Sequence, residues 1–197
     1  MMRTFQILRN IACVCLGLIF FTSGMAKLYA EHAFPGIIGP VWLEDELAKY
    51  GLGLFARFVA TGQVLVGFLL LTLRFSTLGA VMLVPMVLNI LVVTIALQWQ
   101  GTPWVLAFFL ASNLFVLAVD YPKLLPLIGY RSDTPPTAVL LSWQGNLLWF
   151  SGMALVLASI RVSYFNVELG WLGCFLGLCM AWAGKFLDRR VDQHNRK

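Results

Sequence analysis

Residues 62–83 read GQVLVGFLLLTLRFSTLGAVML and contain the turn from which the fold of the chain can be worked out. Two long apolar runs meet here, and only Arg74, Phe75 and Ser76 separate them. A helix needs about 20 residues to cross a bilayer, and so short a connection makes two helices antiparallel neighbours. The stretch therefore predicts a transmembrane helical hairpin.

The same pattern extends over the rest of the chain. Hydrophobic residues make up 60% of its 197 residues and charged residues 12%, with a mean hydropathy of +0.83. A soluble domain has about 25% charged residues. No segment alternates apolar and polar residues as a membrane barrel must. We therefore expect an all-α, polytopic membrane helical bundle with six spanning helices, at Ile7–Ala26, Ala56–Leu73, Thr77–Leu97, Pro103–Val119, Leu141–Ile160 and Glu168–Gly184.

The distribution of basic residues predicts the orientation, because cytoplasmic loops carry an excess of Lys and Arg. With the N-terminus inside, Lys27, Lys49, Arg57 and Arg161 lie outside, which leaves ten of the 14 basic residues in the cytoplasm. We expect both termini inside (N-in, C-in). The alternative is a signal peptide cleaved near Gly24-Met25-Ala26, which would leave five helices.

Few residues in the chain are suited to hold a metal or redox cofactor. His32 and His194 fall on opposite faces of the predicted membrane, so together they cannot ligate a haem or a metal. The four cysteines lie within the first and last helices and form no CxxC motif. The basic residues lack the interleaved aromatics of a nucleic-acid binder. We expect no metal, no cofactor bound through metal ligands or covalently, and no nucleic-acid partner.

Charged and polar residues gather at the predicted outer boundary of the membrane. Lys27 ends the first helix, Glu44 and Glu46 lie in the following outer segment, and Arg57 and Gln63 open the second helix. Oppositely charged groups at a membrane boundary usually pair, and lysine can extend to lipid headgroups. The alternative is a ligand-binding site in which these five residues receive a quinone or lipid headgroup.

Asn89 and Asn113 are predicted to lie at one depth in the membrane. They stand 11 and 13 residues from Gln100 in the outer turn, which at 1.5 Å per residue differs by about 3 Å. We expect a hydrogen bond between them that joins the third and fourth helices. The alternative is a polar pocket in the bundle core for a lipid or quinone headgroup.

Small residues recur along one face of the last helix. They are Gly170, Gly173, Gly177, Ala181 and Gly184, at spacings of 3, 4, 4 and 3. Such a face lets helix backbones approach closely in lipid. The stripe predicts tight packing, either inside this bundle or against a partner subunit or a second copy.

The first helix carries Arg9, then Gly17-Leu18-Ile19-Phe20, Ser23-Gly24 and Lys27. Together with FPGIIGP at residues 34–40 and the hairpin at 62–83, this order resembles the DoxX-like family of small bacterial and archaeal membrane proteins. The resemblance covers residues 7–120. It implies a four-helix core at residues 1–125, packed through Gly17 and Gly24, a Pro-rich cytoplasmic connector at 126–140, and an added transmembrane hairpin with a basic tail at 141–197.

The resemblance favours a location in a bacterial or archaeal cytoplasmic (inner) membrane and leaves three functional hypotheses. The first is an accessory or anchor subunit of a larger membrane assembly, with no catalytic chemistry of its own. The family includes the small subunit of thiosulfate:quinone oxidoreductase, which implies as the second a quinone-facing subunit of an oxidoreductase. The third is a lipid or small-solute binding or transport protein.

Overall fold

The computed structural model describes residues 2–39, 41–129 and 142–195, and all regular elements in these ranges are helices. Six of them are long and apolar enough to cross a membrane: α1 (Met2–Leu28), α3 (Gly53–Thr72), α4 (Ser76–Ala96), α5 (Thr102–Val119), α7 (Trp143–Ser163) and α8 (Val167–Asn195). Between them lie η1 (Ala30–His32), α2 (Leu43–Ala48), α6 (Tyr121–Leu124) and η2 (Leu125–Ile128). The prediction of an all-α, polytopic bundle with six membrane-length helices is confirmed.

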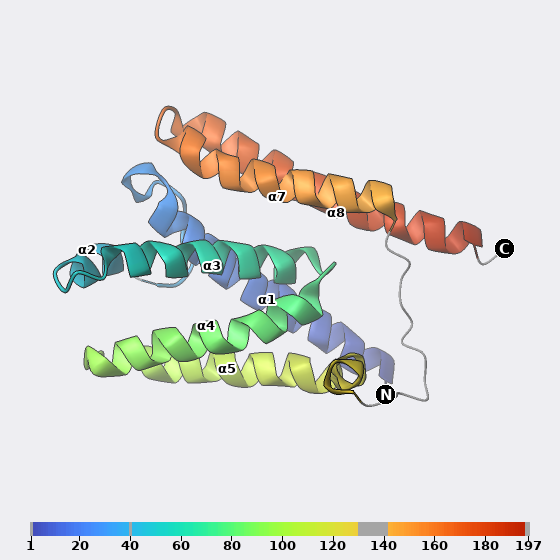
Figure 1. Cartoon of the computed structure of the whole chain (residues 1–197), viewed down its shortest axis with the longest axis horizontal. Coiled ribbons are helices and arrows are strands. Elements are labelled where there is room, and N and C mark those ends of the chain that lie inside the picture. Colours follow the sequence, from blue (N-terminus) through green and yellow to red (C-terminus); the bar gives the residue numbers. More distant parts are fainter. Residues whose placement is uncertain (1, 40, 130–141, 196–197) are drawn as a thin grey trace.

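The long helices are arranged around α1 and α3. Figure 1 shows α4 and α5 on one side of α3 and the α7–α8 hairpin on the other, with α1 crossing behind α3. The N- and C-termini lie at the same end of the bundle, as an even number of crossings requires. We call this the inner end and the opposite end, which carries α2 and the α4–α5 and α7–α8 turns, the outer end, after the predicted topology.

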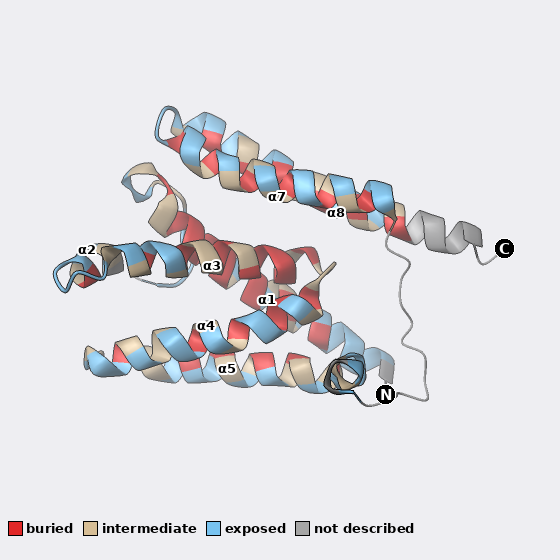
Figure 2. Ribbon diagram, viewed as in Figure 1, coloured by how far each residue is buried: buried red, intermediate tan, exposed pale blue. Residues whose placement is uncertain are grey.

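The buried centre of the bundle is the contact between α1 and α3. In one apolar 18-residue stretch of each, 61% and 56% of the residues are buried, against 28% or less in the corresponding stretch of each other long helix. Figure 2 shows this contrast. Glycine allows the close approach, because a Cβ on Gly24 would lie 2.6 Å from the carbonyl oxygen of Ala60. Gly17 is likewise pressed against the backbone of Leu71. The outer faces of the remaining long helices are left to the lipid.

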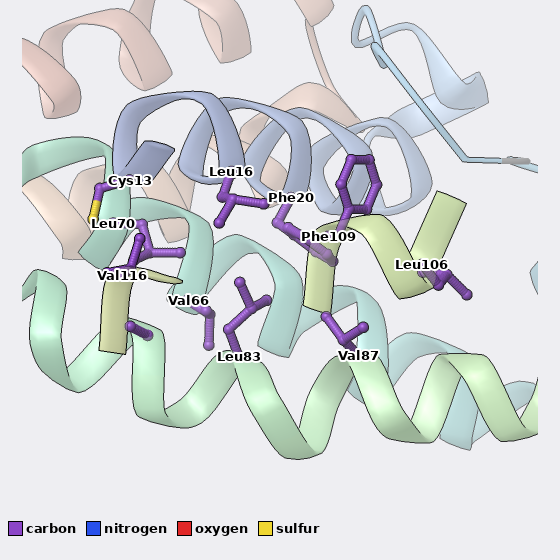
Figure 3. Close-up of a cluster of buried hydrophobic side chains, with 11 residues drawn as sticks. Cys13, Leu16, Phe20, Val66, Leu70, Leu83, Val87, Leu106, Phe109 and Val116 are labelled. Atoms are coloured by element: carbon purple, nitrogen blue, oxygen red, sulfur yellow. The ribbon is translucent and has the colours of Figure 1, made fainter. Parts of the chain in front are cut away.

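Two clusters of buried apolar side chains hold the bundle together. The first joins α1 and α3 to α4 and α5, and includes Leu16, Phe20 and Phe109 (Figure 3). The second joins α1 and α3 to the α7–α8 hairpin around Trp149, whose indole N–H donates to Thr72 Oγ1 at 3.1 Å. The hairpin therefore packs on the predicted four-helix core. Residues 130–140 of the predicted connector lie outside the described residues.

The small-residue stripe of α8 faces α7 inside the hairpin. A Cβ on Gly177 would lie 2.6 Å from the carbonyl oxygen of Gly152, and one on Gly184 2.8 Å from that of Gly145. Gly170 and Gly173 pack in the same way against Ser163 and Ser159. Of the two expected uses of the stripe, the structure shows the intramolecular one.

Candidate functional site

A partly open pocket lies near the outer end of the bundle, among α1, α3, α4 and α5. Its cavity volume is about 90 Å³. Phe20 and Phe109, which touch edge to face with ring centroids 5.8 Å apart, form part of its apolar wall, and Figure 3 shows both rings within the buried cluster. The polar residues that line it are Ser23, Lys27, Glu44, Gln63, Asn89, Thr94 and Thr102.

Lys27 is the centre of the polar part of this pocket. Its ammonium donates to Ser23 Oγ at 2.7 Å, to the Ser23 carbonyl at 3.2 Å and to Gln63 Oε1 at 3.0 Å. Ser23 and Gln63 are buried, with 6% and 5% of their surfaces exposed. In the part of the chain that the structure describes, no carboxylate lies within ion-pair distance of Lys27. The predicted pairing of Lys27 with an outer acidic residue therefore does not form there.

The predicted acidic and basic residues of the outer segment pair with one another. Glu44 lines the pocket and accepts from Arg57 Nε at 2.5 Å. Glu46 accepts from Lys49 Nζ at 2.6 Å on the exposed surface of α2, and this hydrogen bond raises the pKa of Lys49. The structure thus brings three of the five predicted ligand contacts, Lys27, Glu44 and Gln63, to one pocket. Arg57 reaches it only through Glu44, and Glu46 is not among its lining residues.

The outer loop closes over the lysine. Gly39 has φ of +111°, and a Cβ there would lie 2.8 Å from Ser23 Oγ and 3.4 Å from Lys27 Nζ. A side chain at this position would be strained by the backbone conformation and would displace the side chains of Ser23 and Lys27. The indole rings of Trp42 and Trp99 also pack against each other, tilted by 51° with their centroids 5.1 Å apart, which links the outer segment to the α4–α5 turn.

Asn89 and Asn113 do not form the expected hydrogen bond. The Asn113 side chain is fully buried and donates to the carbonyl oxygen of Ala80 at 2.8 Å, nine residues before Asn89 on α4. Asn89 lines the outer pocket instead. Counting residues from the turn assumed that α4 and α5 face each other at equal depth, and the register between the two helices is different. The Asn113 Oδ1 atom is buried without a hydrogen-bond partner.

Two buried ion pairs at the inner end were not predicted. Arg9 of α1 binds Asp120 beyond α5, and Asp120 also accepts from Thr77 at 2.8 Å and from Lys123 at 2.7 Å. The Asp120 side chain is completely buried. Burial alone would raise the pKa of Asp120, but the hydrogen bonds from Lys123, Arg9 and Thr77 outweigh it and hold the pKa below its usual value.

The second buried pair joins the hairpin to the core. Arg74, in the turn between α3 and α4, contacts Asp188 of α8 at 2.9 Å and also bonds the carbonyl of Gly145 on α7. Asp188 in turn accepts from the backbone N–H and the hydroxyl of Ser142.

A further polar contact joins the hairpin to the core at the outer end. Tyr29 Oη lies 2.8 Å from Ser159 Oγ, and burial raises the pKa of this tyrosine to about 12. These contacts depend on helix rotation, which the sequence pattern leaves open.

The described residues contain no group of three or more His, Cys, Asp or Glu side chains placed to hold a metal ion. The four cysteines are free thiols. The polar groups that line the outer pocket are one ammonium, one carboxylate, the amides of Gln63 and Asn89, and the hydroxyls of one serine and two threonines. The rest of the lining is mainly apolar. This arrangement can hold the polar head of a molecule whose remainder is apolar.

Comparison of the chain with protein-family models, with curated proteins and with solved structures gives no significant match. The DoxX-like resemblance therefore remains a prediction from the sequence, and what is known of the chain's site comes from its own geometry.

Proposed function

We propose that this membrane protein is a ligand-binding accessory subunit, which holds the headgroup of a lipid-soluble molecule, a lipid or a quinone, in the outer pocket. Any covalent or redox chemistry would take place in a partner. The observation that supports this proposal is the placement of Lys27, Ser23 and Gln63 in one partly open, otherwise apolar pocket. A lysine that served only to reach lipid headgroups would extend outward, whereas Lys27 turns inward toward Gln63.

The structure gives less support to the hypothesis that the chain only anchors a larger membrane assembly. One of its grounds was the glycine stripe on α8 as a seat for a partner subunit, and this stripe is covered by α7. Exposed apolar side chains on the bundle's surface do not favour a protein partner, because lipid covers such surfaces equally well. Ligand binding in the pocket is therefore the best supported of the three hypotheses. We combine it with the accessory role, in which a partner subunit would use the bound ligand.

Ligand binding can be tested by thermal unfolding of the purified protein in detergent, with decylubiquinone or palmitate added. A ligand that binds only the folded state at 100 times its Kd stabilises it by about 2.7 kcal/mol. We expect at least one of the two to raise the unfolding temperature. Val93→Phe should abolish the shift, because Val93 lines the pocket and a larger side chain would fill it.

Val92→Phe is the matched control, since Val92 precedes Val93 on α4 and is 65% exposed toward the lipid. It should leave the ligand-induced shift unchanged. If neither compound stabilises the wild-type protein, the proposed function is wrong. The same conclusion follows if Val93→Phe binds as well as Val92→Phe does.

A further inference from the structure

The hydrogen bonds around Lys27 fix the directions in which its neighbours can bond. An ammonium has three N–H donors and no acceptor, so each atom that faces it must be an acceptor. Gln63 must therefore turn its Oε1 toward Lys27, and Ser23 must offer a lone pair of Oγ. This assignment of the Gln63 amide follows from the chemistry of its partner.

What remains unused in the cluster is a set of donors. The hydroxyl hydrogen of Ser23 and the two amide hydrogens of Gln63 have no acceptor within the described part of the chain. Both side chains are more than nine-tenths buried and both line the pocket. The Gln63 amide nitrogen is not among the described side-chain atoms that are fully buried without a partner, so it stays open to a ligand. A ligand that completes this cluster must therefore present acceptor oxygens.

The charges of the pocket add a second requirement. Lys27 and Arg57 each carry a positive charge, and Glu44, whose carboxylate is 2.5 Å from Arg57, carries a negative one. The net charge of these three side chains is +1. The positive charge without a counter-charge is that of Lys27, which has no carboxylate partner among the described residues. An unpaired cation in an apolar membrane pocket is unfavourable, and a single negative charge on the ligand would neutralise it.

We infer that the outer pocket binds the carboxylate end of a long-chain fatty acid. This inference rests on the proposed function and specifies its ligand. The three N–H donors of Lys27 are already used by Ser23 and Gln63. One carboxylate oxygen would therefore accept from the Ser23 hydroxyl and the other from the Gln63 amide nitrogen, with the Lys27 ammonium beside them as the counter-charge. The apolar wall at Phe20 and Phe109 would contact the first methylenes. A carboxylate ends a single chain, which suits a cavity of about 90 Å³. A phosphodiester would have to bring two arms into the same space.

The test is equilibrium binding of radiolabelled palmitate to the purified full-length protein in detergent, with unlabelled competitors. Methyl palmitate keeps the carbonyl oxygen but lacks the charge, and hexadecanol lacks both the charge and the carbonyl. We expect palmitate to compete at least about tenfold better than methyl palmitate, because charge-assisted hydrogen bonds are roughly twice as strong as neutral ones. Hexadecanol should compete least.

Two substitutions separate charge from packing. Lys27→Met removes the ammonium and should lower palmitate affinity at least about tenfold while leaving methyl palmitate affinity nearly unchanged. Gln63→Glu keeps the shape of the side chain and places a carboxylate 3.0 Å from Lys27. It should pair with the lysine, preserve the fold and exclude palmitate by charge. Lys49→Met is the control, because Lys49 lies on the exposed surface of α2, and it should bind palmitate normally.

The outcomes distinguish this inference from the proposed function. Equal binding of palmitate and methyl palmitate, with no effect of Gln63→Glu, would overturn the inference and leave a pocket for neutral ligands such as quinones. Displacement of palmitate by phosphatidylglycerol at equal concentration would overturn the choice of a carboxylate. If palmitate, its ester and decylubiquinone all fail to bind, both the inference and the proposed function are wrong.

Discussion

Replacement of Asp120 by alanine tests whether the inner-end network holds the first helix in place. Asp120 is completely buried and receives hydrogen bonds from Arg9, Thr77 and Lys123, so that one carboxylate connects α1 with α4 and α6. In the Asp120→Ala variant, the Arg9 guanidinium would keep its 2.7 Å bond to Ser76 but would lose its counter-charge.

The expected loss can be estimated from the burial of the two partners. Removing one member of a buried ion pair costs about 3–5 kcal/mol, because the other charge is left uncompensated. Arg9 exposes only 6% of its side chain, which places it in this class. The Lys123 side chain is 49% exposed, so its bond to Asp120 is worth about 1 kcal/mol or less. We therefore expect Asp120→Ala to destabilise the fold by about 3 kcal/mol and Lys123→Met by at most about 1 kcal/mol.

The assay is unfolding in mixed micelles of increasing SDS content, followed by tryptophan fluorescence. It is applied to Asp120→Ala, Lys123→Met, Arg9→Met and the double variant that combines Arg9→Met with Asp120→Ala. The double variant should recover part of the loss, because it removes the unpaired charge, and the double-mutant cycle then gives the coupling energy. A loss in Asp120→Ala no larger than that in Lys123→Met would refute the reasoning. So would a double variant as unstable as the sum of its single changes.

Three further predictions concern packing, orientation and pH. Gly24→Ala should destabilise the fold by about 1–3 kcal/mol, because its Cβ would meet the Ala60 carbonyl, whereas Gly62→Ala, whose Cβ would lie 3.5 Å from Met86 Cε, should be nearly neutral in the same titration. In a cysteine-free chain, Gln100→Cys should react with an impermeant maleimide added to intact cells and Pro122→Cys only after lysis; the reverse pattern would show that the predicted orientation is inverted. The lowered pKa of Asp120 contributes stability that is complete above about pH 4, its value in the unfolded chain, and is lost as the pH falls through the folded value. Asp120→Asn should remove this acid-dependent part of the unfolding free energy, and an unchanged pH profile would assign it to other groups.

The sequence predicted the helices well because membrane crossing imposes length and polarity directly. Each of the six long helices covers most or all of a predicted apolar run, including α5, for which the run begins at Pro103. The exception in its bounds is α8, which continues past the predicted end at Gly184 to Asn195. Two of the polar residues that line the pocket were singled out for a related reason, whereas Ser23, Thr94 and Thr102, which also line it, were not. So few polar side chains occur in these helices that Lys27 and Gln63 stand out, and both open onto one boundary of the membrane.

The contacts that the sequence did not predict depend on the rotation and axial position of one helix relative to another. Arg9 and Arg74 were counted as positive charges at helix ends, which was enough for topology. Their partners Asp120 and Asp188 are 111 and 114 residues away in the chain, and nothing in the local pattern of either residue points to the other. The Asn89–Asn113 contact was expected from depth alone. Depth can be counted from a turn, whereas rotation and axial shift are set by packing that the whole bundle decides.

The α7–α8 hairpin is held to the rest of the bundle at both ends. Arg74 with Asp188 and Thr72 with Trp149 form the contacts at the inner end, and Tyr29 with Ser159 forms the contact at the outer end. These three polar contacts fix the axial position and the rotation of the hairpin against the bundle, because sliding or turning the hairpin would break all of them at once. Side-chain contacts thus determine where the hairpin packs on the bundle, and its position does not depend on the peptide connection between residues 129 and 142. Two polypeptides, divided between Gly129 and Ser142 and made in the same cell, should therefore assemble in the same register.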